Sequence, residues 1–334
     1  MKKLRVGVVG LGFIGALHAR IMHELPNVDL VAVSDLRGDV ADDTAKKYSC
    51  KAYIDYNAMM KAEALDAVSV TLPDELHPEA AICAAEHGLS VLLEKPIAKT
   101  AAEGKRILDA CARCGTRLMV AQVLQFDPRY AQLRDAIKAD RLGEIVHMFL
   151  KRTNPRASAE RLNGRASIFH YIGVHDIEMM CTYAQSRPVT VYCKMVSKIN
   201  AEYHSEDSVF ATVTFENGAL AVIELCWALP NNSALGINTY VEVVGSKAAG
   251  YVSIQDQGIS IVTPEAVEYP DTLHWPEYNG QVLGDLKEEL AHFITATLSG
   301  APYIVDNQNA LMAAKVIDAC FASIASGMPE AIEN

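Results

Sequence analysis

The sequence lacks an excess of positive charge, a bilayer-length apolar segment and a disulfide framework. Its 334 residues carry a formal net charge of −11, which argues against nucleic acid or an anionic membrane as the main partner. No apolar run approaches the length that spans a bilayer, and a strand-like segment beginning at Leu4 leaves no room for a signal peptide. We therefore expect a cytoplasmic protein that binds a small molecule.

The eight cysteines are scattered, and most of them lie inside apolar patterns. Such cysteines are typical of small core residues in a reducing compartment. Cys111 and Cys114 form a CxxC pair, but there is no second pair and no nearby pair of histidines. Packing at a helix end is therefore favoured over a redox or zinc site. The length favours two domains with ample core.

The segment from Leu4 to Asp35 contains the most informative pattern. An apolar run over 6–9 leads into Gly10-Leu11-Gly12-Phe13-Ile14-Gly15, and a helical pattern and a second apolar run, Leu30–Val33, follow. Asp35 ends that run, about twenty residues after the last glycine. Strand, glycine turn, helix, strand and acid occur in the order that a dinucleotide-binding fold requires.

Each residue type in this pattern has a physical reason. Gly10 permits the tight turn, Gly12 lets the backbone approach a pyrophosphate, and Gly15 lets helix and strand pack closely. Free N–H groups at the helix start face the phosphates, and the Asp35 carboxylate is placed to accept hydrogen bonds from ribose hydroxyls. The candidate cofactor residues here are Gly10, Gly12, Phe13, Ile14, Gly15, Asp35 and Arg37.

Short apolar strands alternate with helices up to Gln122, which predicts a doubly wound parallel sheet of the α/β class. Ligands bind such sheets outside the carboxyl ends of the strands. At one end, Glu94-Lys95-Pro96 places a lysine at the mouth of a cleft, and a cis bond before the proline would fix its direction. The further cofactor candidates at strand ends are Thr71, Leu72, Pro73, His77, Glu94, Lys95, Pro96 and Gln122.

After Gln122, strand-like runs follow one another without helices between them. Glu216-Asn217-Gly218 between two of these runs is typical of a hairpin turn, and the order predicts an antiparallel sheet. Two helices, over 281–298 and 307–326, end the chain. The uncovered face of an open sheet needs cover, so we expect a homodimer or homotetramer.

These patterns predict two domains. A dinucleotide-binding domain is expected over 1–122, and an α+β domain for substrate binding and oligomerisation is expected over 123–334. The sheet of the second domain is expected to be large, open and mostly antiparallel. The last helix is expected to pack back on the first domain.

The expected helix 167–185 contains a second group of polar residues. Tyr171 and His175 are four residues apart and share a helix face, with His170 and Asp176 on neighbouring faces. Histidine is the commonest residue for moving a proton near neutral pH, although buried structural histidines are also common. Spacings of five and one do not place three metal ligands on one face, so no metal is expected.

A basic segment precedes that helix. We interpret it first as a solvated face and second as a clamp for a phosphate or carboxylate. Its members are Lys151, Arg152, Arg156, Arg161 and Arg165.

Together these motifs resemble the Gfo/Idh/MocA family, the glucose–fructose oxidoreductase and inositol dehydrogenase type of sugar oxidoreductases. The resemblance covers essentially the whole chain and rests on GLGFIG, TLPDELH, the Glu94-Lys95-Pro96 stretch, GVHDIEMM and the closing segment DNQNALMAAKVIDACFASIASG. It implies a Rossmann domain followed by a domain with a large, mostly antiparallel sheet. It also implies a nicotinamide cofactor and a sugar, cyclitol or sugar-nucleotide substrate.

The resemblance implies that Lys95 polarises the reacting oxygen and that His175 is the general acid/base. Many members carry an Asp four residues before that histidine, where this chain has Tyr171, so Tyr171 or His170 is expected to contact the substrate instead. Asp35 favours NAD because a carboxylate repels a 2′-phosphate, whereas Arg37 would favour NADP if Asp35 turned away. The substrate-binding candidates are Tyr171, His170, Asp176 and Arg152.

The leading hypothesis is an NAD(H)-dependent oxidoreductase acting on a secondary hydroxyl or ketone of a sugar-like molecule. One alternative is a glycosidase that uses bound NAD transiently, which part of the family resembles. Another is a catalytically silent nucleotide-binding protein. The sequence leaves the substrate open.

Overall fold

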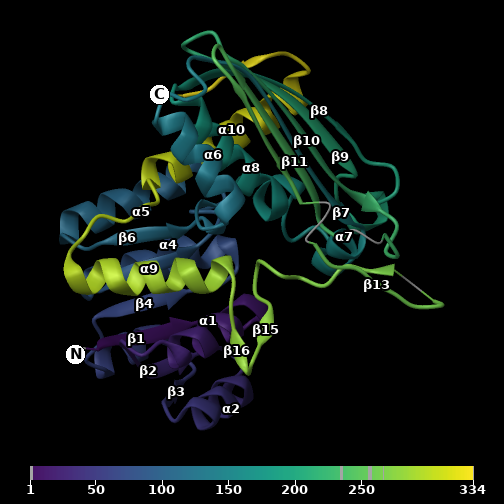
Figure 1. Cartoon of the computed structure of the whole chain (residues 1–334). Helices are drawn as coiled ribbons and strands as arrows, with labels where there is room; N and C mark the ends of the chain where they lie inside the picture. Colours follow the sequence, from purple (N-terminus) through teal and green to yellow (C-terminus); the bar gives the residue numbers. More distant parts are fainter. Residues whose placement is uncertain (1–2, 234–235, 255–257, 266, 334) are drawn as a thin grey trace. The chain divides into compact units, whose positions relative to one another are not determined.

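The computed structural model describes residues 3–233, 236–254, 258–265 and 267–333. The chain forms two compact units (Figure 1). Unit 1 comprises Met1–Phe126 and Leu273–Leu311, and unit 2 comprises Asp127–Thr272 and Met312–Asn334. Each unit has its own sheet and is described by itself.

Unit 1 is built on a six-stranded parallel sheet with the order β3-β2-β1-β4-β5-β6. The strand order reverses between β1 and β4, which creates the switch point where such sheets bind ligands. The strands are β1 (Leu4–Val9), β2 (Val28–Ser34), β3 (Lys51–Tyr53), β4 (Ala67–Val70), β5 (Ser90–Glu94) and β6 (Leu118–Ala121). The helices are α1 (Phe13–Glu24), α2 (Gly38–Tyr48), α3 (Tyr56–Ala62), α4 (His77–Glu86), α5 (Ala101–Cys114) and the short 3₁₀ turns η1 (Asp74–Leu76) and η2 (Val123–Gln125). The predicted doubly wound sheet is confirmed.

The central strands are apolar along their whole length because helices cover both faces of the sheet. Every residue of β4 and β6 is buried. α5 begins with a capping box, in which the Thr100 side chain accepts from the Glu103 N–H and Glu103 accepts from the Thr100 N–H. α5 ends at Gly115, which adopts a φ of 66° in the left-handed region.

One late segment of the chain also belongs to unit 1. It contains a hairpin of β15 (Glu277–Tyr278) and β16 (Gln281–Val282), followed by helix α9 (Asp285–Ser299). The apolar face of α9 joins the core formed by β1, β2 and α1. The expected division at residue 122 placed all of this segment in the second domain, and the packing places it in the first unit instead.

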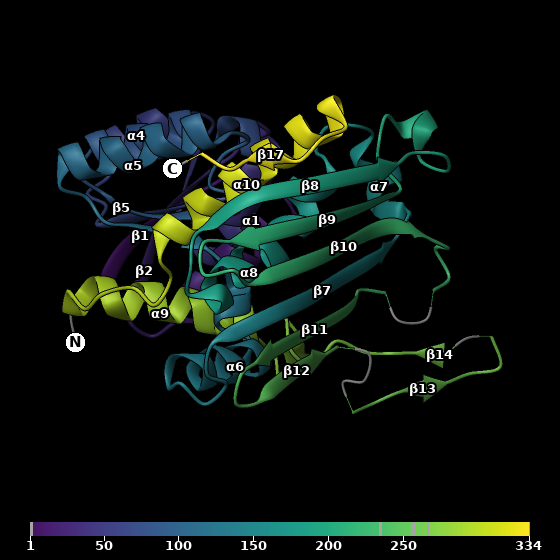
Figure 2. The ribbon, with the colours of Figure 1, turned by 90° about the horizontal axis from the view of Figure 1, so that it is seen from above.

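Unit 2 contains a seven-stranded sheet with the order β12-β11-β7-β10-β9-β8-β17, seen strand beside strand in Figure 2. Neighbouring strands are antiparallel except β7 and β10, which run parallel, so the sheet is mixed and mostly antiparallel, as predicted. The strands are β7 (Ile145–Pro155), β8 (Pro188–Val196), β9 (Ser208–Phe215), β10 (Leu220–Leu229), β11 (Asn238–Gly245), β12 (Ala249–Ser253) and β17 (Glu330–Ala331). A separate two-stranded ribbon joins β13 (Ile261–Val262) and β14 (Val267–Glu268).

Helices cover one face of this sheet. α8 packs on β7 and β10, and α6 packs on β12. The helical elements are α6 (Pro128–Lys138), α7 (Ala157–Leu162), the π-helical turn η3 (Phe169–Gly173), α8 (Val174–Ala184), the 3₁₀ turn η4 (Ala201–Tyr203) and α10 (Asn307–Ser326). On the other face, strand side chains such as Phe210, Leu220 and Tyr251 are exposed.

Helix α10 corrects the expectation that no apolar run approaches the length that spans a bilayer. Among the described residues it is long and apolar enough, by length and composition, to cross a membrane. Half of its apolar stretch is buried, and the Ser323 hydroxyl accepts a hydrogen bond from the Cys193 N–H of β8 at 2.9 Å. These contacts are those of a core helix. Its first residues belong to unit 1 and the rest to unit 2.

Candidate active site

The turn after β1 is shaped by its glycines. Gly10 has a φ of 88°, a conformation that favours glycine. A Cβ on Gly15 would lie 2.1 Å from the Gly10 carbonyl oxygen, whereas a Cβ on Gly12 would meet nothing within 4 Å. Two glycines therefore form the turn, and the third leaves open space before the start of α1. That space fits a pyrophosphate close to the backbone.

The Asp35 carboxylate anchors the loop beside this turn. It accepts hydrogen bonds from the Leu11 N–H at 2.8 Å and from the Arg37 N–H at 2.9 Å. Arg37 Nε lies 3.1 Å from the same carboxylate. Burial raises the pKa of Asp35, but the hydrogen bonds from Arg37 and Leu11 outweigh burial, and the pKa lies below its usual value. Asp35 is therefore ionised at neutral pH, and Arg37 is bound to it.

Aromatic residues flank the glycine turn. Phe13 is largely exposed, and its ring lies 5.8 Å from that of Trp275 in an edge-on arrangement. The hairpin that follows Trp275 is fixed to α1, because Arg20 Nη1 contacts Glu277 at 2.7 Å. The late segment of unit 1 thus reaches the glycine turn. Sequence reasoning missed this contact because the residues are far apart in the chain.

The residue that follows β4 is bonded to the glycine turn. The Thr71 hydroxyl lies 2.9 Å from the Val9 carbonyl oxygen and 2.7 Å from that of Gly10. His77 is buried, with Nδ1 2.8 Å from the Pro96 carbonyl and Nε2 2.9 Å from the Leu72 carbonyl. Burial lowers the pKa of His77, against the effect of the two carbonyls. His77 therefore lies between two strand ends, with a backbone carbonyl near each ring nitrogen, and the cofactor contact predicted for it stays a prediction.

A buried polar chain leads to Lys95 at the end of β5. Ser69 Oγ lies 2.7 Å from His18 Nδ1, and His18 Nε2 lies 3.2 Å from Glu94 Oε1. The other Glu94 oxygen accepts the Lys95 N–H at 3.1 Å. Burial raises the pKa of Glu94, but His18 and Lys95 lower it more, and the carboxyl is ionised. The peptide bond between Lys95 and Pro96 is cis.

A second buried carboxyl, which the sequence did not single out, lies in the same cluster. Glu289 on α9 is fully buried, and neither of its oxygens has a hydrogen-bond partner among the residues that the structure describes. Burial raises the pKa of Glu289 well above its usual value, the nearby Glu94 and Asp285 raise it further, and Lys95 opposes them. Burial and the two neighbouring carboxyls therefore favour the protonated form of Glu289. The sequence does contain a signal that could have identified this residue, namely an acid on the apolar face of a helix.

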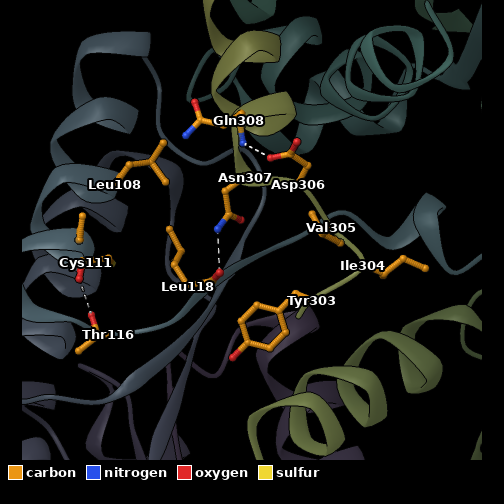
Figure 3. Close-up of a pocket in the computed structure, with 11 residues that line it drawn as sticks. Leu108, Cys111, Thr116, Leu118, Tyr303, Ile304, Val305, Asp306, Asn307 and Gln308 are labelled. Carbon is orange, nitrogen blue, oxygen red and sulfur yellow. Dashed lines mark hydrogen bonds between the residues drawn. The ribbon is translucent and has the colours of Figure 1, made fainter. Parts of the chain in front are cut away.

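A pocket lies elsewhere in unit 1 (Figure 3). It measures about 610 Å³ and is lined by the end of α5, the start of β6 and residues 303–308. Inside it, Asn307 donates to the Leu118 carbonyl at 2.7 Å. Because it opens at the amino end of β6, away from the carboxyl ends where such sheets bind ligands, we do not assign it to the candidate site.

In unit 2, the segment with the predicted histidines begins with an irregular turn. Residues 169–173 form a π-helical turn before α8, a feature common at functional sites. A Cβ on Gly173 would lie 2.4 Å from Leu225 Cδ1, so glycine allows the helix to approach β10 closely. His170 Nδ1 lies 2.9 Å from Ser167 Oγ, and His175 is half-buried in the first turn of α8. The sequence predicted a helix over 167–185, and the structure is helical over 169–184, with a π-helical first turn that the sequence did not predict.

Arg152 and Asp176 form a buried ion pair across β7 and α8. Arg152 Nε and Nη2 lie 2.5 and 3.3 Å from the Asp176 oxygens, and both side chains are almost fully buried. Burial raises the pKa of Asp176, and the Arg152 guanidinium opposes that effect. The two charges are engaged with each other. We therefore assign this pair to holding α8 on the sheet, in place of the substrate contact predicted for both.

Tyr171 lies next to the positively charged guanidinium of Arg161. Arg161 Nη2 donates to the Tyr171 hydroxyl at 2.5 Å, and the guanidinium lies 5.5 Å from the centre of the Tyr171 ring. The Tyr171 ring lies 6.2 Å from that of the buried Trp227. The structure thus brings together Tyr171, Arg161 and, one turn further on, His175. Lys95 belongs to unit 1 and His175 to unit 2.

Comparison with known proteins follows the same division of the chain. Residues 4–122 match an oxidoreductase family with an NAD-binding Rossmann fold, and residues 130–250 match the GFO/IDH/MocA C-terminal domain. An inositol 2-dehydrogenase of Rhizobium meliloti is 27% identical over 96% of this chain and 97% of that protein. A scyllo-inositol 2-dehydrogenase (NAD(+)) of Bacillus subtilis is 24% identical over 98% of this chain and 96% of that protein.

Solved structures show the same fold. A putative myo-inositol dehydrogenase from Sinorhizobium meliloti has a TM-score of 0.84 at 26% identity, covering 99% of this chain and 100% of that one. A scyllo-inositol dehydrogenase from Lactobacillus casei, with bound NAD(H) and scyllo-inositol, has a TM-score of 0.85 at 18% identity, covering 99% of each chain.

A Rossmann sheet with a glycine turn, joined to a mixed sheet of this topology, defines a class of NAD-dependent oxidoreductases. The chain belongs to the Gfo/Idh/MocA family of that class, and it is similar to inositol dehydrogenases along its whole length.

Proposed function

We propose that this protein transfers a hydride between NAD and a secondary hydroxyl or ketone of a sugar, cyclitol or sugar derivative. The observation that carries the proposal is the placement of Lys95. It follows an ionised, buried Glu94 at the carboxyl end of β5, in a sheet whose glycine turn fits a dinucleotide. The similarity to inositol dehydrogenases supports the class of substrate.

In the proposed reaction, the Lys95 ammonium donates a hydrogen bond to the reacting oxygen and polarises it. The His175 imidazole accepts the proton of the hydroxyl during oxidation and returns it during reduction. Bound NAD supplies the hydride acceptor, so that the alcohol loses a hydride and a proton and becomes a ketone. Glu94 fixes the backbone at Lys95 through its contact with the Lys95 N–H.

The residues of unit 1 fit NAD better than NADP. The Asp35 carboxylate is ionised and lies beside the glycine turn, where it would accept the ribose hydroxyls and repel a 2′-phosphate. Arg37, the cation that could bind that phosphate, is held by Asp35. We infer that NAD is the preferred coenzyme.

The test is a panel of polyols, aldoses and sugar nucleotides, assayed with NAD and NADP in parallel. Lys95→Ala should lower kcat/KM for the best substrate by about 100-fold or more, because an acid–base or charge-stabilising group is lost. NADH binding, followed by fluorescence, should survive. Lys105→Ala is the matched control, since Lys105 is an exposed lysine of α5 paired with Asp109.

The outcomes separate the competing functions. Full activity in Lys95→Ala would remove that lysine from the mechanism. Glycoside cleavage without added NAD, and without stoichiometric NADH release, would indicate the NAD-dependent glycosidase. Tight NAD binding with no turnover on the whole panel would indicate a nucleotide-binding protein without catalysis.

We also propose that the exposed face of the unit 2 sheet forms a homodimer or homotetramer in the cytoplasm. Exposed apolar side chains of three strands, Phe210, Leu220 and Tyr251, support this. Light scattering after size exclusion would test it, and a monomer at micromolar concentration would contradict it. Phe210→Lys should weaken the assembly.

A further inference from the structure

The structure divides the basic segment of residues 151–165 into two parts. This segment has five basic side chains and one acidic side chain in a protein of net charge −11. The first two basic residues are neutralised, since Lys151 Nζ lies 3.4 Å from Glu224 and Arg152 is paired with Asp176. The interpretation of this segment as a solvated face is therefore wrong for Arg152, which is buried.

Arg161 differs from these two residues. It lies in the last turn of α7, and the only acid of that helix, Glu160, lies 3.2 Å from the amide nitrogen of Asn231. The side-chain Oδ1 of Asn231 accepts the Ala157 N–H at 2.7 Å, so α7 is fixed to the segment that follows β10. Among the described residues, no carboxylate lies within ion-pair distance of Arg161.

The Arg161 side chain is instead directed to an aromatic pair. Its Nη2 bonds to the Tyr171 hydroxyl, and Tyr171 lies against Trp227, whose indole N–H donates to the Glu206 carbonyl. A phenol oxygen accepts a hydrogen bond but does not neutralise a positive charge. A guanidinium has five N–H donors in a planar fork, and Tyr171 occupies only one side of it. The fork is therefore oriented and still able to receive two oxygens.

The partner of the Arg161 guanidinium, Tyr171, lies close in the chain to the proposed acid/base residue. Tyr171 lies in the π-helical turn, four residues before His175, and the two residues belong to one continuous helical segment. Arg156, at the N-cap of α7, adds a second positive charge to the same short stretch. An oriented cation next to a proposed acid/base residue is an arrangement that selects an oxyanion.

We propose that Arg161 and Tyr171 bind an anionic group of the substrate, so that the preferred substrate is an acidic sugar or cyclitol carrying a carboxylate or a phosphate. This inference rests on the proposed function and specifies its substrate class. Arg161 would hold two oxygens of the anion through its fork, and the Tyr171 hydroxyl would donate to one of them.

The experiment compares matched neutral and charged substrates: glucose with glucuronate and with glucose 6-phosphate, and myo-inositol with a myo-inositol monophosphate. Wild-type kcat/KM should be about 10- to 100-fold higher for the preferred charged member, since hydrogen bonds to charged groups have this strength. Comparing the carboxylate with the phosphate shows which oxyanion the site takes. The preference should fall as ionic strength rises.

Arg161→Ala should remove the preference, so that kcat/KM for the charged and the neutral member of each pair agree within about threefold. Arg161→Lys should restore only part of it, because an ammonium lacks the planar fork. Tyr171→Phe should lower the preference less than Arg161→Ala does. Arg187→Ala is the control, since Arg187 is a partly exposed arginine of unit 2 near Glu216. Circular dichroism verifies that each variant folds.

Equal kcat/KM for charged and neutral members, unchanged in Arg161→Ala, would overturn the inference and leave the proposed function standing. If no substrate is oxidised, the proposed function fails, and calorimetry then decides the inference separately. Glucuronate or glucose 6-phosphate should bind wild-type protein saturated with NADH at least about tenfold more tightly than Arg161→Ala. Equal affinities would overturn it.

Discussion

The surroundings of Lys95 and those of Tyr171 differ in the sign of their excess charged groups. Near Lys95 the excess is acidic, because Glu94 and Glu289 are both buried there. The raised pKa of Glu289 disfavours a second negative charge in that interior. Near Tyr171 the excess is basic, and Arg161 retains its charge at the surface. In the first region the charges lie next to one another inside the protein, whereas in the second Arg161 keeps a surface charge that we propose binds an anionic group.

The same contrast occurs between two neighbouring residues of β7. Arg152 points inward to Asp176, and Lys151 points outward to Glu224. Both residues are in ion pairs, but only the first pair is withdrawn from water. Removing one partner of a buried pair leaves an uncompensated charge in the interior, whereas an exposed partner is replaced by solvent.

The largest effect on stability is therefore expected for Asp176→Ala. It should lower the free energy of unfolding by about 3–5 kcal/mol, because Arg152 stays buried without its partner. Glu224→Ala should cost less than about 1 kcal/mol. Urea unfolding followed by circular dichroism measures both values. The double variant Arg152→Met with Asp176→Leu should recover much of the loss, and equal losses in the two single variants would contradict the assigned role of the buried pair.

The sequence predicted the features that depend on local backbone geometry. The glycine turn, the alternation of strands and helices and the position of Asp35 follow from residues close in the chain, and the fold was predicted from them. The strand order of unit 2 was not, because β7 pairs with β10 and β11, more than sixty residues further on.

The predicted site was less complete for the same reason. The sequence placed Asp176 and Arg152 at the substrate, but their pairing across β7 and α8 is a tertiary contact that spacing does not reveal. Glu289 was missed because acids are rarely buried, although its place on the apolar face of α9 was an available signal. The π-helical turn at 169–173 depends on packing against β10, where Gly173 meets Leu225.

The next prediction concerns the coenzyme end of unit 1, where an acid and a base neutralise each other at the surface. Asp35→Ala should free Arg37 and remove the charge that repels a 2′-phosphate. The ratio of NADP to NAD affinity should rise by about 10- to 100-fold, since hydrogen bonds to charged groups have this strength. Fluorescence titration with NADH and NADPH measures it.

Two controls test the cause of that change. Asp35→Ala with Arg37→Ala should lose the part of the gain in NADPH affinity that Arg37 supplies, because the cation is then absent. Asp29→Ala should leave the ratio unchanged, since Asp29 is exposed and paired with Arg5. A ratio that stays constant in Asp35→Ala would mean that another residue selects the coenzyme.

The smallest expected effect tests the buried acid near Lys95. Because the pKa of Glu289 is raised in the folded protein, the folded state keeps a proton that the unfolded chain releases above about pH 4.3. Stability is therefore lost as pH rises from that value towards the raised pKa. Glu289→Gln removes this loss, and its free energy of unfolding relative to wild type should increase by about 1–2 kcal/mol between pH 5 and pH 8. Glu288→Gln, at the exposed neighbouring position, should show no such increase. If the free energies of unfolding of wild type and Glu289→Gln change in parallel with pH, the pKa of Glu289 is not raised in the folded protein. The region around Lys95 would then not differ from the region around Tyr171 in the way argued above.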